Sequence, residues 1–429
     1  MKKKLLLSVL SLLAIMGTTT VTNAQEFFLS EGTEILVPWG DAEFDEQEAL
    51  AFFTLYHHED YMAPSVPKFV ITDKKARAMF TIGGFVNFRT AYDFNYVMPN
   101  LDFVPADINI GGATVGNRQR ALMDASTSRL FFESVVKTRC GKPITAYVET
   151  DFRGDGNTLR LRQAYISFNG LKFGQATSTF TDVASAYNTI DFEGPNAFSY
   201  TRNLLIQYTK AWNCGFEIGV GLEFPKVQAM YNNYATEVYQ KVPDIPLYMQ
   251  YSWGESTNRS HIRASGIMRN MYYADQVTQK TVDNVGWGAQ LSGRLAISDW
   301  GCFYGQALYG KGISTYIQDL QGYSYDMNYS SVTDGVMLDI PAMAWFAGME
   351  INLTERMPLT LGYSQVRVYN GVGLSADDYK LGQYVVANCF YSISRFWSVG
   401  VEYLYGAIHK ISGSFGRSNR AQAAVQFNF

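Results

Sequence analysis

Apolar and polar residues alternate along most of this chain, from about residue 78 to the C-terminus. In the first such stretch Phe80, Ile82 and Val86 fall on one face, whereas Asn87 and Arg89 fall on the other. Alternation with a period of two is typical of a β-strand whose two faces lie in different environments. Charged residues occupy only one face of each stretch, so that face is predicted to contact water.

The alternation predicts an all-β chain that folds into a transmembrane antiparallel β-barrel of about sixteen strands. The predicted strands cover residues 78–94, 126–138, 143–152, 158–168, 171–178, 200–210, 215–224, 246–254, 259–272, 284–298, 301–313, 343–353, 358–369, 381–393, 396–409 and 418–429. An even number of strands returns both termini to one side of the membrane, and a barrel of this size encloses a water-filled lumen.

The connections between the predicted strands alternate in length. Short ones, such as Asn169-Gly170 and Asp299-Trp300, are followed by long ones near residues 95–125, 179–199, 225–245, 313–341 and 370–380. A soluble β-sandwich also shows alternating strands, but it needs no such rhythm of its turns. Short periplasmic turns with longer external loops indicate an outer-membrane barrel.

The N-terminus has the organisation of a secretory signal peptide. A cationic start is followed by an apolar run over residues 5–16, and Ala24 lies at the end of a cleavage-like sequence. We therefore predict a signal peptide over residues 1–24 and a mature chain that begins at Gln25. Residues 25–77 are acidic and contain prolines, so we predict a short periplasmic extension with a candidate helix over residues 45–56. The barrel then covers residues 78–429.

Composition agrees with this picture. Aromatic residues make up 15% of the chain and charged residues 17%, and the mature sequence has no run of about 18 apolar residues, which excludes an α-helical membrane protein. Removal of the signal peptide changes the formal charge from −4 to −7. The mature chain is acidic and has no contiguous basic block that could bind nucleic acid or anionic lipid. Nucleic acid is therefore not a predicted partner.

The four cysteines are Cys140, Cys214, Cys302 and Cys389. They are far apart in the sequence and form no metal-binding motif, so neither a metal site nor another cofactor is predicted. On the predicted strand map they lie several strands apart near the periplasmic end. We therefore predict free thiols, because a disulfide needs Cα atoms within about 7 Å.

Charged residues of both signs are predicted to face the lumen. The predicted pore-lining residues are Arg89, Asp93, Glu133, Arg263 and Arg294. A narrower set, predicted to form a pore constriction, comprises Arg129, Glu149, Asp151, Arg160, Arg162, Asp182, Asp191 and Glu193. Such groups either set solute preference at a constriction or pair with one another and keep the lumen wet.

Two features place the constriction. Arg160 and Arg162 lie on one face of one strand, about 7 Å apart by strand geometry, with Glu149 and Asp151 on the preceding strand as acidic neighbours. The long connection over residues 179–199 follows this region and is a candidate to fold into the lumen, since loops of this length often carry function.

An enzymatic alternative rests on few residues. The histidines are His57, His58, His261 and His409, and no nucleophile elbow or zinc-protease motif accompanies them. Each is interpreted as a solvated or interfacial histidine, and no catalytic residue is predicted.

Several motifs resemble those of the DcaP-like porins. They are Gly83-Gly84 with Tyr92-Asp93-Phe94, Ser128-Arg129-Leu130, the stretch from Ala146 to Phe152, the stretch from Leu159 to Tyr165, the stretch from Gly174 to Phe180, and Asp191 to Pro195. These motifs cover roughly the first third of the barrel, and beyond residue 210 the resemblance rests on strand pattern. Gln163 departs from the family pattern, where His is expected, and the N-terminal extension has no coiled-coil repeat.

The resemblance implies a homotrimeric porin whose inward loop and arginines favour small anions, dicarboxylates among them. Arg129, Arg160, Arg162 and the 179–199 loop would then form the constriction. The final strand ends in Phe429, like the signal read by barrel-assembly machinery, and the strand composition suggests a Bacteroidetes source.

We thus expect an outer-membrane porin that contacts outer-membrane lipid and lets small hydrophilic or anionic solutes diffuse through. The alternative is a barrel that acts mainly in binding or adhesion through its external loops.

Overall fold

A computed structural model describes residues 34–38, 68–72, 78–99, 101–111, 116, 118–139, 141–254, 259–369, 373–394 and 396–429. The predicted signal peptide, the candidate helix over residues 45–56 and Cys140 lie outside the described residues. Within the described part, no helix is long and apolar enough to cross a membrane.

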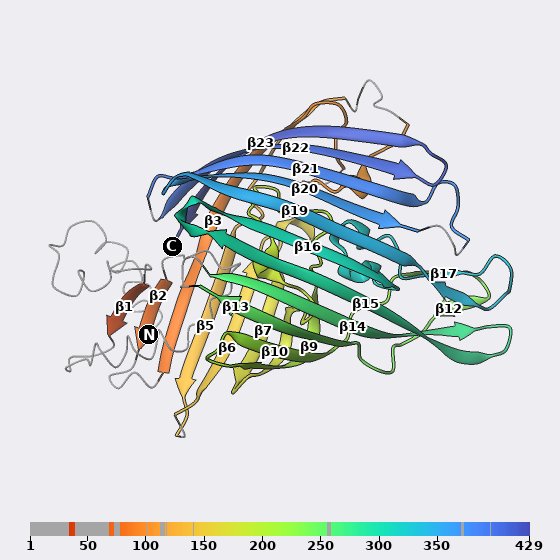
Figure 1. Ribbon diagram of the computed structural model, residues 1–429, viewed down its shortest axis with the longest axis horizontal. Coiled ribbons are helices and arrows are strands. Elements are labelled where there is room, and N and C mark those ends of the chain that lie inside the picture. Colours follow the sequence, from red (N-terminus) through yellow and green to blue (C-terminus); the bar gives the residue numbers. More distant parts are fainter. Residues whose placement is uncertain are drawn as a thin grey trace.

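Sixteen antiparallel strands close into one barrel, which confirms the predicted fold class (Figure 1). The barrel consists of β3 (Ala78–Asp93), β5 (Arg129–Lys137), β6 (Pro143–Asp151), β7 (Arg160–Phe168), β8 (Leu171–Thr177), β9 (Arg202–Ala211), β10 (Phe216–Glu223), β13 (Ile245–Trp253), β14 (Ser260–Asp275), β15 (Lys280–Ile297), β16 (Gly301–Lys311), β19 (Pro341–Thr354), β20 (Met357–Val368), β21 (Tyr379–Ser392), β22 (Trp397–Lys410) and β23 (Phe415–Asn428). Each strand pairs with its neighbour in sequence, and β23 pairs with β3 to close the barrel.

The strand prediction failed mainly in two places. The segment 273–283 was assigned to a loop, whereas β14 and β15 continue as a long hairpin that pairs Asp275 with Lys280. The strand opposite the second half of β3 is β4 (Arg120–Asp124), which was also assigned to a loop and is separated from β5 by a short break. Both segments lack a clean apolar alternation, so pairing with a neighbouring strand decided their structure.

The closing seam joins the first and last strands of the barrel. Phe429 and Gly84 exchange two backbone hydrogen bonds of 3.1 Å at the end of β23. Directly beyond, β2 (Lys68–Thr72) pairs with β3 from Gly83 to Met79, and β1 (Glu34–Pro38) pairs with β2 in parallel. These strands therefore extend the sheet at the end of the barrel where the C-terminus lies (Figure 1).

The two faces of the barrel wall differ as the alternation predicted. Val86, Leu204 and Val401 are more than half exposed on the outer face, whereas inward-facing neighbours such as Leu404 are buried. The tight turn between β7 and β8 is made by Asn169 and Gly170, which both adopt positive φ values of 50° and 85°. Asn and Gly tolerate this conformation better than other residues, and it suits a two-residue hairpin.

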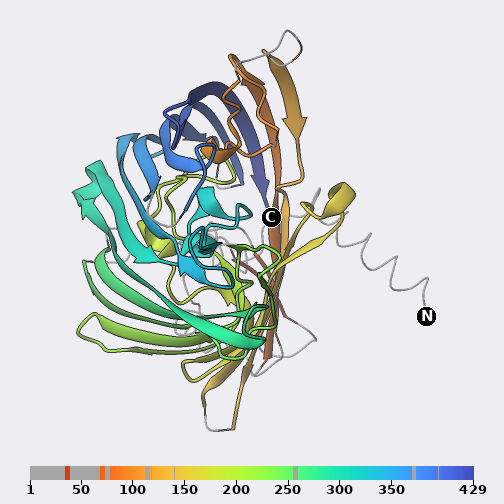
Figure 2. The same cartoon turned by 90° about the vertical axis from the view of Figure 1, so that its right-hand side faces the viewer.

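Three long connections fold into the lumen (Figure 2). They are the described residues of the connection 94–111 with η1 (Pro105–Asp107), residues 178–201 with η4 (Val183–Ser185), and the first part of the connection 312–340, residues 312–326, with η7 (Ser314–Tyr316) and η8 (Gln318–Leu320). Their side chains, Phe103, Phe180 and Leu320 among them, form one buried cluster with inner-wall residues such as Leu308 and Leu404.

This cluster is formed with the inner wall from β14 to β22, whereas the arginine-rich wall lies on β5 to β9. In the second part of the connection 312–340, β17 (Met327–Tyr329) pairs with β18 (Met337–Asp339) and with β11 (Ala229–Met230), and β12 (Ala235–Glu237) pairs with the far end of β14.

Candidate functional site

Five of the predicted constriction residues come together on the inner wall of β5, β6 and β7. Arg160 donates to Asp151 through Nε at 3.0 Å and Nη2 at 2.6 Å, and Arg162 Nη1 donates to the same carboxylate at 2.9 Å. Arg162 Nε donates to Glu149 at 2.5 Å, and Arg129 Nη1 lies 3.4 Å from the same Glu149 oxygen. Antiparallel pairing explains the cluster, because Glu149 and Asp151 face β5 on one side and β7 on the other.

The acidic and basic members of this cluster differ in exposure. The side chains of Asp151 and Glu149 are 0% and 6% exposed, whereas that of Arg160 is 34% exposed and that of Arg129 is 14% exposed. The carboxylates are thus covered by the guanidinium groups that bind them. The surface that this cluster presents is positive, although its charges are largely paired.

Arg202, the first residue of β9, adds a further positive charge beside this cluster. Its guanidinium lies 5.8 Å from the centre of the Tyr200 ring, and its charge interacts with those of Arg160 and Arg162. Its Nη1 is buried without a hydrogen-bond partner, and among the ion pairs of the described residues none involves Arg202. An unpaired guanidinium leaves a positive potential that an anion can neutralise.

Phe192, in the inward connection 178–201, covers the arginines. The ring centre lies 4.5 Å from the guanidinium carbon of Arg153, 5.2 Å from that of Arg162 and 5.9 Å from that of Arg160. These distances suit cation–π attraction, so the ring fixes the connection against the charged wall.

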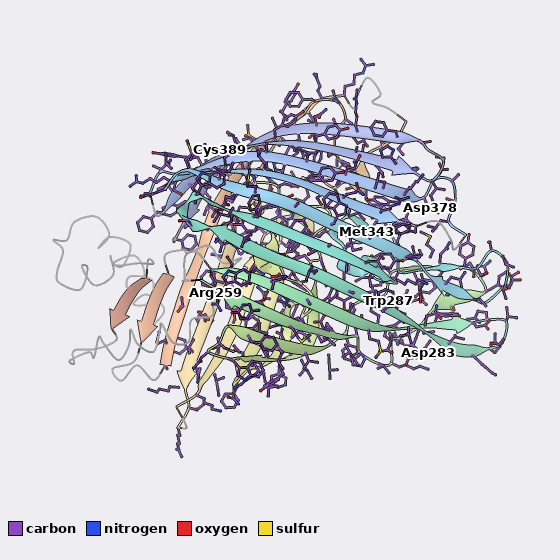
Figure 3. All side chains as sticks on the ribbon, viewed as in Figure 1. Arg259, Asp283, Trp287, Met343, Asp378 and Cys389 are labelled. Carbon is purple, nitrogen blue, oxygen red and sulfur yellow. The ribbon has the colours of Figure 1, made fainter. Side chains whose placement is uncertain are left out.

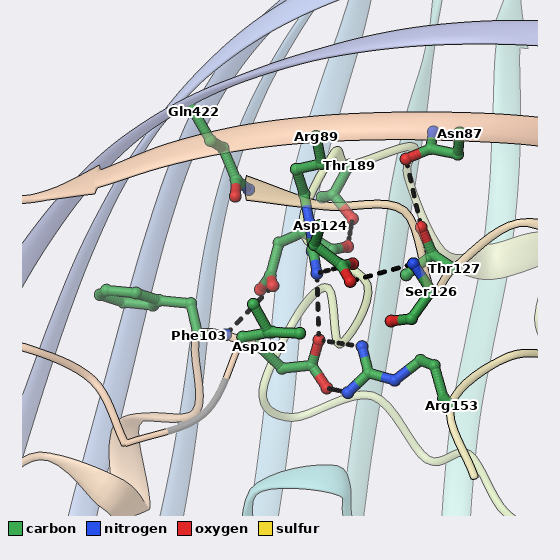
Figure 4. A network of polar contacts seen from close by, with 12 residues as sticks. Asn87, Arg89, Asp102, Phe103, Asp124, Ser126, Thr127, Arg153, Thr189 and Gln422 are labelled. Atoms are coloured by element: carbon green, nitrogen blue, oxygen red, sulfur yellow. Dashed lines mark hydrogen bonds and ion pairs between the residues drawn. The ribbon is translucent and has the colours of Figure 1, made fainter. Parts of the chain in front are cut away.

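Arg153 links this cover to a second polar network (Figure 4). It donates to both oxygens of Asp102 at 2.6 and 2.5 Å, and Asp102 lies 3.7 Å from Arg89. Arg89 Nη2 in turn donates to Asp124 at 3.2 Å. The network joins β3, β4, the inward connection that holds Asp102 and the β6–β7 connection that holds Arg153, and it buries Arg89 rather than leaving it to line an open surface.

The inward connection 178–201 is also anchored on the opposite wall. Glu402 of β22 accepts hydrogen bonds from the backbone N–H groups of Ile190 and Asp191 at 2.8 and 2.9 Å. Ser364 of β20 accepts one from the backbone N–H of Ala197 at 2.9 Å. Residues 178–201 thus cross the lumen, as the sequence predicted for this connection.

Asp182 lies away from the arginine cluster to which it was assigned. Its Oδ2 lies 2.9 Å from His261 Nε2 of β14 and accepts a hydrogen bond of 2.6 Å from Ser292 of β15. The interpretation of His261 as solvated or interfacial is wrong, because the residue is only 5% exposed and holds Asp182. His261 alternates to the inner face, where the inward connection covers it.

Asp191 and Glu193 lie closer to the cluster. Asp191 accepts hydrogen bonds from the backbone N–H of Phe103 at 3.1 Å and from Tyr384 at 3.2 Å. Burial, together with the carboxylates of Asp102 and Glu402, raises the pKa of Asp191 to about 7. Burial also raises the pKa of Glu193 well above its ordinary value.

The other predicted pore-lining residues are spread along the barrel. Asp93 is buried and accepts from Arg420 Nε at 2.6 Å. Arg263 lies 3.5 Å from the centre of the Tyr248 ring and donates to the carbonyl of Thr179. Arg294 donates to the Arg259 carbonyl at 2.7 Å, and Glu133 lies on the inner face of β5 next to Tyr147 of β6.

Comparison with known proteins decides the family. A model of the family described as DcaP outer membrane protein matches residues 65–429. The chain belongs to this family. The DcaP resemblance noted in the first part of the barrel therefore extends over its full length. No curated protein sequence matches the chain significantly.

Solved structures show the same fold. The outer membrane channel DcaP of Acinetobacter baumannii is 21% identical, with a TM-score of 0.70 over 83% of this chain and 98% of that one. An anion-selective porin from Comamonas acidovorans is 14% identical, with a TM-score of 0.53 over 82% of this chain and 100% of that one. OmpF of Salmonella typhi, in complex with daunomycin, is 12% identical, with a TM-score of 0.53 over 82% of this chain and 98% of that one.

The DcaP-family chain is accordingly an outer-membrane β-barrel of the porin type. Family and fold point to a channel rather than an enzyme. In the described part of the chain, no three His, Cys, Asp or Glu side chains are grouped as a metal site would require.

Sequence reasoning missed Arg153, Phe192, Arg202 and Glu402 as residues of this site. Phe192 lies within a motif that carried the family resemblance, and Arg202 directly follows the long inward connection. Both positions in the sequence could therefore have predicted a place at the site. Alternation with the outward Val401 and Tyr403 places Glu402 on the inner face of its strand, but its role as an anchor depends on a contact more than 200 residues away in sequence.

Proposed function

We propose that this DcaP-family barrel is a passive diffusion channel for small hydrophilic solutes and that it prefers anions, dicarboxylates among them. The observation that carries the proposal is the unequal exposure within the charged wall. Asp151 and Glu149 are covered, whereas Arg160 and Arg129 are exposed in part. A solute that loses water beside this wall is compensated by positive charge if it is an anion.

Arg202 strengthens the same preference. Because it has no carboxylate partner among the described residues, its charge adds to the field of the wall instead of being neutralised. Arg160 and Arg202 lie on strands separated by β8, about 10 Å apart by strand spacing. Two separate positive groups suit an anion that carries two carboxylates.

Reversal potentials across a salt gradient in planar bilayers test the preference. We expect stepwise channel openings and a reversal potential of the sign for anion permeation, larger at 0.1 M than at 1 M salt because screening shortens the Debye length from about 10 Å to about 3 Å. Liposome swelling should rank a dicarboxylate above a neutral sugar of similar size, and both above a diamine. A cation-selective channel would contradict the anion preference.

A homotrimer is the assembly that we infer. One of the structural neighbours, OmpT of Vibrio cholerae, was solved in a trimer form, at 14% identity and a TM-score of 0.50. Light scattering on the protein in mild detergent should give three chains per particle. A monomer would contradict the trimer and leave the channel unaffected.

We also propose that residues 1–24 direct export and are removed, and that residues 25–77 remain in the periplasm. In support, β2 pairs with the part of β3 that extends beyond the C-terminal end of its neighbour β23. The strand β23, which closes the barrel and is followed by Phe429, is the segment that assembly machinery would read. Mass spectrometry of the mature protein should find Gln25 at the N-terminus.

A barrel that acts mainly in adhesion is the second candidate. Tyr239 and Val332, in the connections 224–244 and 312–340, are 97% and 93% exposed and would suit a binding surface. Electrically silent insertion into bilayers would favour this alternative.

A further inference from the structure

The outer face of the barrel is layered along strands β20 and β22. The outward residues of β22 include Val401, Tyr403, Tyr405 and His409, so an apolar zone is followed by an aromatic zone and then by an imidazole. On β20 the same order runs from Leu361 through Tyr363 to Arg367. Aromatic residues at the boundary between hydrocarbon and head groups are typical of outer-membrane barrels.

Basic side chains gather directly beyond the aromatic zone. This outer basic cluster consists of Arg367 (β20), Lys380 (β21), His409 (β22) and Arg417 (β23). Arg367, Lys380 and Arg417 are exposed. Their inward neighbours Val366, Val368, Gly416 and Ser418 are buried, so Arg367 and Arg417 alternate to the outer face.

The register of the sheet places these residues at one level. Arg367 pairs with Leu381, Leu381 with His409, and His409 with Phe415, two residues from Arg417. Four adjacent strands are about 14 Å wide, so the cluster forms a row rather than a single point charge. The row lies at the end of the strands opposite to the C-terminus, which is the end where Figure 3 labels Asp378.

The charges of this row are available to a partner. Within the described residues, no ion pair involves Arg367, Lys380, His409 or Arg417. Asp378, in the adjoining connection, accepts hydrogen bonds from the backbone N–H of Ser375 and from Tyr325. Arg367 also stacks on Tyr369 at 5.0 Å, which holds its guanidinium beside the aromatic zone.

We propose that the outer basic cluster binds the phosphate groups of the phosphorylated glycolipid that forms the outer leaflet. The Arg and Lys side chains of this row lie just beyond the aromatic zone, at the depth of a lipid head group, and each Lys or Arg near an anionic membrane surface adds attraction. Guanidinium groups match phosphate geometry with paired hydrogen bonds. A head group with more than one phosphate would engage several strands together.

Binding of lipid A tests the proposal. Wild-type protein in detergent is titrated with bis-phosphorylated lipid A and with the same lipid after removal of both phosphates, and bound lipid is counted by native mass spectrometry. The variant R367Q/K380Q/R417Q removes three charges from the cluster. The matched variant K210Q/R259Q/R356Q removes three exposed charges from the opposite end of the barrel, where Figure 3 labels Arg259.

We expect the cluster variant to bind bis-phosphorylated lipid A at least tenfold more weakly than wild type, and the matched variant to bind it like wild type. The dephosphorylated lipid should bind equally weakly to all three. Equal binding by wild type and cluster variant would overturn the proposal, as would complete displacement of the lipid by an equal concentration of inorganic phosphate. Heat-modifiable migration on gels confirms folding, and the single variants R367Q and R417Q, each expected to weaken binding, replace the triple variant if it does not fold.

Discussion

Arg160 donates two hydrogen bonds to Asp151, which is fully buried beneath it. The arginine is thus both a structural partner and the exposed charge of the site. The sequence left open whether these charged groups set solute preference or pair with one another. They do pair, but the pairing does not remove the positive surface.

The pairing determines the effect of removing the arginines. In R160A/R162A, Asp151 loses both guanidinium groups that bind it, and Glu149 loses that of Arg162 but keeps that of Arg129. We expect the reversal potential to shift toward cations and the conductance to increase at both 0.1 and 1 M salt, with a smaller shift at high salt. Q426A, which removes an uncharged inward side chain of β23, is the control. An unchanged reversal potential in the double variant would refute the role of this wall.

Arg202 offers a contrasting test. Because Arg202 forms no ion pair within the described residues, R202A should lower anion preference without a large gain in cation affinity and without a large change in conductance. The same bilayer recordings measure both quantities. A shift toward cations as large as that of R160A/R162A would mean that Arg202 has a carboxylate partner in the membrane.

Glu402 anchors the inward connection 178–201 on β22. E402A leaves the N–H groups of Ile190 and Asp191 without their partner, along with the side chains of Asn388 and Gln422. Each stranded buried donor costs roughly 1–3 kcal/mol, so the connection should leave the wall. We expect higher conductance and new proteolytic cleavage within residues 178–201. T360A is the control, since this buried inward hydroxyl binds no partner; similar behaviour of the two variants would show that the anchor is unimportant.

Asp191 predicts a pH dependence of the same connection. Its pKa is raised from 3.8 to about 7, so between these values the folded protein retains a proton that the unfolded chain has lost. The packing of the connection is therefore most stable at low pH and weakens as pH rises toward 7. We expect current fluctuations to increase between pH 5 and pH 8, and D191N to reduce this difference. Equal pH dependence in both proteins would assign it to another group.

The cysteines provide a chemical test of the strand order. Cys214 is exposed, Cys302 is buried and Cys389 is half-buried, and all three are free thiols. In detergent, an alkylating reagent should modify Cys214 rapidly and Cys302 only after unfolding, as read by peptide mass spectrometry. A disulfide between any two of these residues would contradict the strand order.

The sequence by itself determined the barrel. Each strand has one face toward lipid and the other toward water. Apolar and polar residues therefore alternate along it, from Phe80 and Ile82 in β3 to Val425 and Phe427 in β23. Neighbouring strands also follow one another in sequence, and this made the pairing of Arg160 and Arg162 with Glu149 and Asp151 predictable. The weakly alternating β4 escaped detection because only its pairing with β3 defines it.

Only the tertiary structure decided what fills and surrounds the barrel. The sequence pointed to one inward connection, whereas three fold inward, because their apolar residues bury against inner-wall positions far away in sequence, such as Phe103 near Tyr384. Long-range contacts also decide that Asp182 binds His261 rather than the arginine cluster, and that Phe192 covers the arginines. The outer basic cluster has the same origin, because its four residues are far apart in the sequence and the register of four strands brings them together.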